Sequence, residues 1–78
     1  MITVQVRLNG ALAERLGARR GVALADGATV ADLRAALSAS AALPPSVAVS
    51  VGGRIVGDEE PLTDGAEVAV LLPVAGGA

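Results

Sequence analysis

The sequence of 78 residues contains no cysteine, no histidine, and no tryptophan, tyrosine or phenylalanine. Without cysteine the chain cannot form a disulfide bond, a thiolate nucleophile or a zinc-finger site. Without histidine it lacks the usual general base and the commonest metal ligand. We therefore expect no metal site, no bound cofactor and no catalysis by this chain alone.

Lysine is also absent, so all six basic residues are arginines, against eight acidic residues. The net charge of −2, together with the lack of aromatic side chains that could stack on bases, argues against nucleic-acid binding. The same acidity argues against binding to an anionic membrane surface. The sequence has neither a signal-peptide pattern nor an apolar run long enough to cross a bilayer, which predicts a cytoplasmic protein.

Hydrophobic residues make up 53% of the sequence, and they must build an aliphatic core because no aromatic residue is available. A chain of this length forms one small domain whose core stabilises it only marginally. We expect that domain to span residues 1–72 and to be followed by a tail of residues 73–78.

The first third of the chain is expected to form a strand, a short helix and a second strand. Apolar and polar residues alternate over residues 2–8, which predicts a half-buried strand. Although Asn9-Gly10 is typical of a hairpin turn, the helix formers of residues 11–16 favour a short helix with Gly17 as its C-cap. An antiparallel second strand is expected over about residues 20–25. The core-facing residues of the first strand are Ile2, Val4, Val6 and Leu8.

The main helix is expected to begin after Thr29. A capping box pairs this residue with Asp32, so that each side chain can bond a free backbone amide of the first turn. Apolar residues at helical spacing follow, and the helix is expected to reach about Ser40, because Pro44-Pro45 forbids its continuation. This apolar stripe, which needs a sheet to cover it, consists of Val30, Leu33 and Leu37.

The second half of the chain is expected to form three strands. Valines alternate over residues 47–51, Gly52-Gly53 supplies the positive φ angles of a two-residue turn, and a short strand follows at residues 54–56. The acidic run 58–60 is interpreted as a solvated loop, and the last strand is expected over residues 67–72. A mixed sheet of about five strands, with its first and last strands adjacent and one main helix across one face, is the β-grasp fold of the α+β class.

The tail carries the candidate functional residues. Pro73 cannot donate a ladder hydrogen bond and should end the last strand. The small residues beyond it bury too little surface to become ordered, so we expect a thin, flexible peptide that can enter a narrow channel of another protein and present a carboxyl group. A frayed terminus without function is the alternative interpretation. These residues are Val74, Ala75, Gly76, Gly77 and Ala78.

Two stretches near the end of the sequence resemble the MoaD/ThiS family of ubiquitin-like sulfur carriers. They are Leu62-Thr63-Asp64-Gly65-Ala66-Glu67-Val68 and Leu72-Pro73-Val74-Ala75-Gly76-Gly77. The spacing of the two motifs is specific, whereas the Gly-Gly pair alone would be a weak signal. The order of strands, helices and turns agrees over the whole chain. The short helix after the first strand favours the MoaD branch, the small subunit of molybdopterin synthase.

The resemblance implies that the chain is a substrate whose terminal glycine carries the chemistry. Gly77 would be adenylated by a MoeB/ThiF-type adenylyltransferase that uses MgATP, and sulfur would then displace AMP to leave a thiocarboxylate. Gly76 and Gly77 suit a narrow channel because neither has a Cβ. The tail would next enter a MoaE-type large subunit, which transfers the sulfur to the pyranopterin precursor of molybdopterin.

Ala78 departs from the family pattern, which ends at the second glycine. Adenylation requires a free carboxylate, but the carbonyl carbon of Gly77 is bonded to Ala78. Adenylation of Ala78 instead would move the reacting carbon by one residue, roughly 3.3–3.6 Å. We therefore expect that a peptidase, such as a JAMM-type zinc metalloprotease, removes Ala78 first; a residue left by cloning is the alternative.

The last strand also predicts a surface for binding partners. Since Val68 and Val70 should face the core, the residues that alternate with them should point to the other face, beside Ala48 and Ser50. The result would be a small, weakly apolar patch suited to docking the adenylyltransferase and the large subunit. Exposed apolar residues without a function are the alternative. The candidate partner-binding residues are Ala69, Leu71, Leu72, Pro73, Val74 and Ala75.

Three other functions remain open from the sequence alone. The chain could carry sulfur for thiamin synthesis, cysteine synthesis or tRNA thiolation. It could be a ubiquitin-like modifier joined through Gly77 to lysines of target proteins. It could also be a non-catalytic β-grasp interaction module whose tail is inert.

Overall fold

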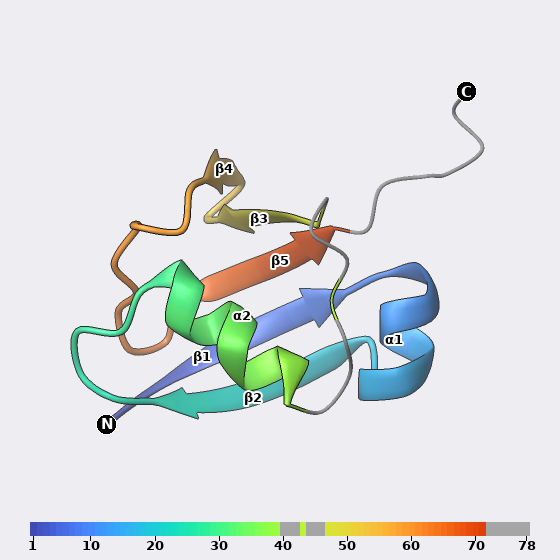
Figure 1. The fold of residues 1–78 in the computed structure, drawn as a ribbon, viewed down its shortest axis with the longest axis horizontal. Helices are drawn as coiled ribbons and strands as arrows, with labels where there is room; N and C mark the ends of the chain where they lie inside the picture. The colour runs from blue at the N-terminus through green and yellow to red at the C-terminus, as the bar shows by residue number, and fades with distance from the viewer. Residues whose placement is uncertain (40–42, 44–46, 72–78) are drawn as a thin grey trace.

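The structure is a computed structural model and describes residues 1–39, 43 and 47–71. Five strands form one mixed sheet in the order β2-β1-β5-β3-β4, and the main helix α2 crosses one face of it (Figure 1). This is the predicted β-grasp architecture. In chain order the elements are β1 (Ile2–Leu8), α1 (Gly10–Leu16), β2 (Arg19–Leu24), α2 (Val30–Ser38), β3 (Ala48–Val51), β4 (Arg54–Val56) and β5 (Glu67–Leu71).

The first and last strands, β1 and β5, lie side by side at the centre of the sheet and run parallel. Their register places Val6 opposite Val68 and Leu8 opposite Val70. The flanking strands β2 and β3 pair antiparallel to this central pair. Because β1 and β5 are parallel, they finish at the same end of the sheet. The helix α1 lies at that same end (Figure 1).

The core lies between the sheet and α2. The alternation of buried and exposed residues is complete along β1, as the period-two pattern predicts. Leu33 of α2 is fully buried, and Val68 of β5 is 1% exposed, so the apolar stripe of the helix packs onto the sheet. The largest fully buried side chains are Val4, Val6, Val30, Leu33, Leu37, Val49, Val68 and Val70.

The main helix begins at the predicted capping box. The Asp32 carboxylate accepts hydrogen bonds from the Thr29 amide at 2.8 Å and from the Thr29 hydroxyl at 3.2 Å. The helix ends at Ser38, two residues before the expected end at Ser40. Ser40 and the Pro44-Pro45 pair that should forbid continuation lie outside the described residues.

The acidic run 58–60 forms hydrogen bonds with the beginning of α2, which the sequence does not indicate. Its side chains are largely exposed, as expected for a solvated loop. Its backbone carbonyls, however, accept two hydrogen bonds from the first turn of α2. The amide of Val30 donates to the carbonyl of Glu60, and the amide of Ala31 donates to the carbonyl of Asp58, each at 3.0 Å. These amides have no partner within the helix, so the loop satisfies donors that would otherwise need water. The loop thus anchors the beginning of α2.

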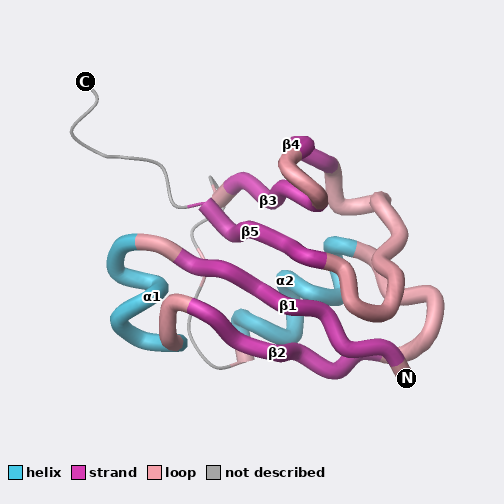
Figure 2. The backbone as a smooth tube through the Cα atoms, turned by 180° about the vertical axis from the view of Figure 1, so that it is seen from behind, coloured by secondary structure: helices cyan, strands magenta, loops and turns pink. Residues whose placement is uncertain are grey.

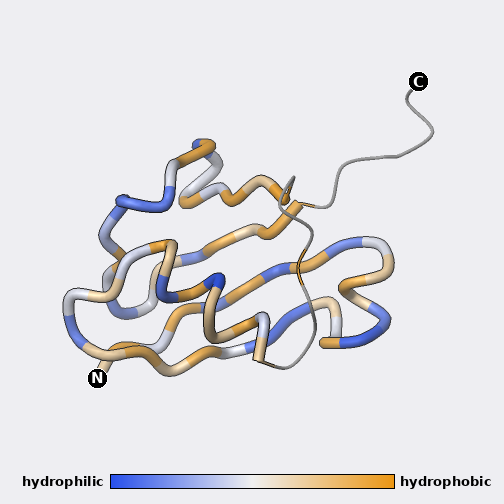
Figure 3. The backbone as a smooth tube through the Cα atoms, viewed as in Figure 1, coloured by the Kyte–Doolittle hydropathy of each residue, from blue (hydrophilic) through white to orange (hydrophobic). Residues whose placement is uncertain are grey.

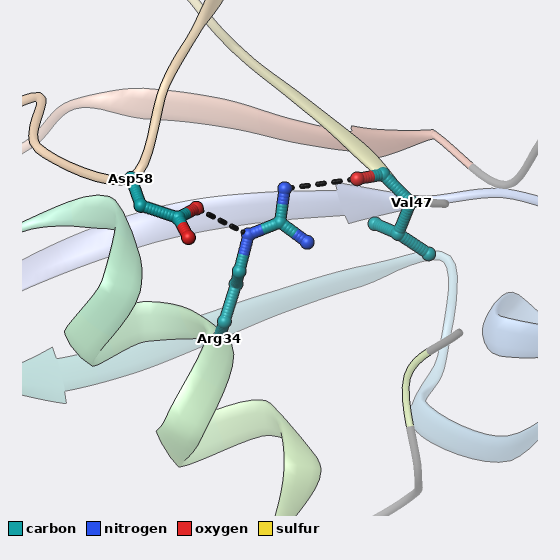
Figure 4. Close-up of polar contacts among 3 residues, drawn as sticks. All are labelled: Arg34, Val47 and Asp58. Atoms are coloured by element: carbon teal, nitrogen blue, oxygen red, sulfur yellow. Dashed lines mark hydrogen bonds and ion pairs between the residues drawn. The ribbon is translucent and has the colours of Figure 1, made fainter. Parts of the chain in front are cut away.

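Arg34 of α2 ties the helix to two distant segments (Figure 4). Its Nε donates to Asp58 Oδ1 at 2.8 Å, and its Nη2 donates to the carbonyl of Val47 at 2.8 Å. The Arg34 side chain is 26% exposed, against 59% for Asp58. Through this one guanidinium group, α2 is connected to the loop after β4 and to the residue that precedes β3.

The Leu62-Thr63-Asp64-Gly65 motif leads the chain into β5. Leu62 is buried in the core. Asp64 Oδ1 accepts from the amide of Thr3 at 2.8 Å, and the amide of Gly65 donates to the carbonyl of Thr3 at 2.8 Å. Gly65 has a φ of 80°, which a residue with a Cβ rarely adopts. The motif therefore fixes where β5 begins relative to β1.

The remaining turns agree with the sequence predictions. Gly52 and Gly53 have φ angles of 59° and 85° and form the two-residue turn between β3 and β4. The short helix α1 ends before Gly17, whose φ is 91°. Of β5, the predicted residues up to Leu71 are confirmed, whereas Leu72 lies outside the described residues.

Candidate functional site

Figure 2 views the sheet from the side opposite α2, and this outer face carries two of the predicted partner-binding residues, Ala69 and Leu71. Along β5, Val68 and Val70 face the core, so Ala69 and Leu71 lie on this outer face. The ladder to β3 places Ser50 opposite Ala69 and Ala48 opposite Leu71. The four residues predicted to share this face therefore do so.

Three of these outer residues are small and partly or fully buried, whereas Leu71 is large and exposed. Leu71 is 39% exposed, and Ala48 and Ala69 are half-buried. Ser50 is 8% exposed, which makes it the only polar residue in the buried set of the described chain. Its ladder neighbours on the same face, Ala69 and Ile55, lie on either side of it. The patch is weakly apolar.

A shallow, open hollow of about 310 Å³ lies beside this patch. It is lined by Arg7, Leu8, Asn9, Ala69 and Leu71, at the end of the sheet where β1 and β5 finish. Sequence reasoning did not single out the contribution of β1. The signal was present, because Arg7 is one of the polar residues that alternate over residues 2–8 and must face away from the core. Only the strand register shows that it lies beside Ala69.

The predicted tail residues lie outside the part of the chain that the structure describes. These are Leu72, Pro73, Val74, Ala75, Gly76, Gly77 and Ala78. Of the predicted site residues, the structure therefore places Ala69 and Leu71. Leu71 is the last residue of β5, at the end of the sheet that also carries α1.

The described residues offer no group that could hold a metal ion: no three Asp, Glu, His or Cys side chains gather within residues 1–39, 43 and 47–71. The described acidic side chains lie on both helices, on β5 and in loops, and several of them form ion pairs. Asp58 binds Arg34, and Glu60 lies 3.4 Å from Arg54. In the same part of the chain, neither helix has the length and apolar character needed to cross a membrane.

The comparisons with known proteins place this geometry in a family. The model of the ThiS family matches residues 6–77. Small archaeal modifier protein 1 of Haloferax volcanii is 26% identical, with 95% of this chain and 100% of that chain covered and a TM-score of 0.83. A protein of Pyrococcus furiosus assigned as molybdopterin converting factor subunit 1 is 25% identical over the same shares, also with a TM-score of 0.83.

A third solved structure contains a partner. A chain of the complex of subunits 1 and 2 of the molybdopterin-converting factor from Helicobacter pylori is 25% identical, with 97% of this chain and 100% of that chain covered and a TM-score of 0.70. A search of the curated proteins gives no match. Because the family model covers nearly the whole sequence and the described fold agrees with these structures, the chain belongs to the ThiS family, which includes MoaD-like proteins, and has the ubiquitin-like β-grasp fold.

Proposed function

We propose that the chain is a sulfur carrier that works as the small subunit of a molybdopterin synthase. The observation that supports this most is the extent of the family match, which runs to residue 77 and so includes both Gly76 and Gly77. The similarity to molybdopterin converting factor subunits favours this pathway over thiamin synthesis, cysteine synthesis or tRNA thiolation.

In this mechanism the reacting group is the carboxylate of Gly77. One of its oxygens attacks the α-phosphate of MgATP in the active site of a MoeB/ThiF-type adenylyltransferase, and pyrophosphate leaves. A sulfur nucleophile then attacks the acyl carbon and AMP leaves, so that the acid becomes a thiocarboxylate. The chain supplies no catalytic side chain, which agrees with its lack of cysteine and histidine.

Two properties of the sequence suit the proposed reaction. Gly76 and Gly77 have no Cβ, so a partner can enclose them in a narrow channel. Gly77 has a free carboxylate only after its peptide bond to Ala78 is cut. We therefore include a peptidase, such as a JAMM-type metalloprotease, as the enzyme that acts first.

The second proposed partner is a MoaE-type large subunit. The Helicobacter pylori complex of subunits 1 and 2 supports a partner of this type. In the proposed complex, Ala69 and Leu71 dock against the large subunit, while Pro73, Val74 and Ala75 lead Gly77 to the pyranopterin. After the sulfur has bonded to the pyranopterin, water attacks the acyl carbon of Gly77 and the C–S bond breaks, which returns the carboxylate for another cycle.

Pyrophosphate exchange tests the first step. The chain ending at Gly77 is incubated with the purified adenylyltransferase, ATP and labelled pyrophosphate, and formation of labelled ATP is measured. We expect exchange with this chain, and none with a chain ending at Gly76 or with the full chain when no peptidase is present. No exchange with any of the three would favour an interaction module whose tail is inert.

A second candidate function is protein modification, because the chain is similar to small archaeal modifier protein 1. In that case an amine of a target lysine would displace AMP from the Gly77 adenylate to form an isopeptide bond. Mass spectrometry of tryptic digests from the native cells distinguishes the two functions. Because the last site for trypsin is Arg54, a remnant of residues 55–77 on lysines of other proteins supports modification, whereas a thiocarboxylate on Gly77 supports sulfur transfer.

A further inference from the structure

The charged residues are distributed unevenly between the two ends of the sheet. Residues 7–20, which include the end of β1, α1 and the beginning of β2, contain four of the six arginines and one acidic residue, Glu14. The rest of the chain contains two arginines and seven acidic residues. The domain is therefore basic at the end where β5 finishes, although its net charge is −2. The four arginines are Arg7, Arg15, Arg19 and Arg20.

Most of these arginines lack an acidic partner. Arg34 and Arg54, outside this region, are paired with Asp58 and Glu60. Arg19 lies 3.7 Å from Glu67, but both side chains are about two-thirds exposed, at 67% and 68%, and such a pair contributes little. The other three make no ion pair or side-chain hydrogen bond within residues 1–39, 43 and 47–71; they are Arg7, Arg15 and Arg20.

Two of the arginines face each other. Arg7 of β1 lies directly opposite Arg19 of β2 on the outer face of the sheet. Like charges at such a position destabilise the strand pair, so the arrangement does not serve the fold. It does raise the positive potential above this part of the sheet. A partner that places carboxylates over the two guanidinium groups would relieve the repulsion.

The two arginines continue directly into the apolar patch. One row of ladder partners crosses all five strands: Arg19, Arg7, Ala69, Ser50 and Ile55. Ile55 is 63% exposed, so the far end of the row is apolar. In Figure 3, which colours each residue whichever face it lies on, hydrophilic residues interrupt apolar ones at α1 and the adjoining ends of β1 and β2, whereas β3 and most of β5 are hydrophobic.

We propose that this divided outer face docks a protein surface that carries carboxylates beside an apolar strip. The carboxylates lie over Arg7 and Arg19, and the apolar strip lies over Ala69, Leu71 and Ile55. The inference rests on the proposed function, because the partner is one that receives the tail. The basic half speeds association and the division fixes the orientation of the partner, so that the end of β5 points toward its active site.

Charge complementarity favours a protein over a nucleic acid as the occupant. Nucleic acid would present negative charge over the whole face, including the apolar half, and the chain has no aromatic side chain on which bases could stack. The acidic remainder of the domain would also repel it. An acidic protein surface with an apolar strip matches both halves.

The test measures the association rate constant between the chain ending at Gly77 and the purified adenylyltransferase, by stopped-flow at several ionic strengths. Arg7→Glu is compared with Arg54→Glu, which changes the net charge equally but lies on β4, outside residues 7–20. We expect Arg7→Glu to lower the rate about tenfold at low salt, and Arg54→Glu to change it less than about twofold. The difference should shrink as salt reduces the Debye length to about 10 Å at 0.1 M.

Further variants separate the effect of the charge of Arg7 from an effect on folding. Arg7→Lys keeps the charge and should associate at the wild-type rate, which would support an electrostatic role. Thermal unfolding checks that Arg7→Glu remains folded, as expected for an exposed residue; if it does not, Arg7→Gln replaces it. Equal rates for Arg7→Glu and Arg54→Glu, while the wild-type chain is still adenylated, would overturn the docking inference alone.

Two other outcomes would also contradict the docking inference. A wild-type chain that is neither bound nor adenylated contradicts the proposed function, and the docking inference falls with it. A labelled single-stranded oligonucleotide that binds the wild-type chain but not Arg7→Glu would identify nucleic acid as the occupant and overturn the choice of a protein.

Discussion

Leu71 lies opposite Ala48 across the ladder between β3 and β5, with 39% of its surface exposed. It is the last residue of β5 and lines the hollow next to Arg7 and Asn9. An apolar side chain at this place gains nothing for the core, which is formed on the other face by residues such as Val70. The position suits a contact that is completed only when a partner binds.

We predict that Leu71→Glu weakens binding to the adenylyltransferase and to the large subunit without unfolding the chain. The substitution would place a charge in an interface from which water is excluded, and we expect a loss of about 2 kcal/mol or more in binding free energy. Calorimetric titration measures the binding. Ala23→Glu is the control, because Ala23 is an exposed residue of β2 on the same face but away from β5. Equal losses for both variants, or unfolding of Leu71→Glu, would contradict the assignment.

Leu33→Ala should destabilise the domain by about 2–5 kcal/mol. Leu33 is fully buried between α2 and the sheet, and its truncation leaves a cavity. The change in unfolding free energy is measured by urea denaturation. Ala35→Ser, at an exposed position of the same helix, should stay within about 0.5 kcal/mol of the wild type. A small effect of Leu33→Ala on the unfolding free energy would contradict the burial of Leu33 in the core.

Arg34→Gln should lower the unfolding free energy by about 1–2 kcal/mol, because the ion pair to Asp58 is lost and the carbonyl of Val47 loses its charged donor. Arg54→Gln removes a longer contact between more exposed groups, 3.4 Å from Glu60, and should change stability by less than about 0.5 kcal/mol. Denaturant unfolding of the two variants side by side checks the difference. The reverse order would show that Arg34 does not connect α2 to β3.

Arg7→Gln should leave the stability unchanged or raise it by up to about 0.5 kcal/mol, since it removes the repulsion from Arg19 across the β1–β2 ladder. The docking inference predicts slower association for the same variant. Thermal unfolding and stopped-flow association measured on one preparation test both effects. A variant that is less stable yet associates normally would show that Arg7 serves the fold rather than the partner.

The order of the elements could be predicted from the sequence because local patterns are enough to specify them. The apolar alternation of β1, the capping box of Thr29 and Asp32, and the Gly52-Gly53 turn each act over a few residues. The adjacency of β1 and β5 was predicted from the need to cover the apolar stripe of α2 with a single sheet, whereas their parallel direction comes from the structure.

Contacts between distant residues could not be predicted in the same way. The Arg34–Asp58 pair joins residues 24 positions apart, and Arg34 is an ordinary exposed helix residue by its spacing. The positions of Arg7 and Arg19 opposite each other depend on the exact ladder register. Asp64 was recognised through a family motif, but its hydrogen bond to the Thr3 amide required the fold. The tail residues, including Gly77, remain predictions because they lie outside the described residues.

Removal of Gly76, Gly77 and Ala78 should leave the unfolding free energy within about 0.5 kcal/mol of the wild type, since the described core is formed by residues 2–70. Sulfur transfer in a reconstituted assay should be lost. Thermal unfolding and product formation, measured on the same truncated chain, separate the two properties. A marked loss of stability would show that these residues pack on the domain.

The central claim is that the carboxylate of Gly77 becomes a thiocarboxylate. Its most direct test is the intact mass of the chain ending at Gly77 after incubation with the adenylyltransferase, MgATP and a sulfur donor. We predict a mass increase equal to the replacement of one oxygen atom by sulfur, located at Gly77 by fragmentation and absent when ATP is omitted. An unchanged mass, in the presence of an adenylyltransferase shown to be active in a control reaction, would contradict this claim.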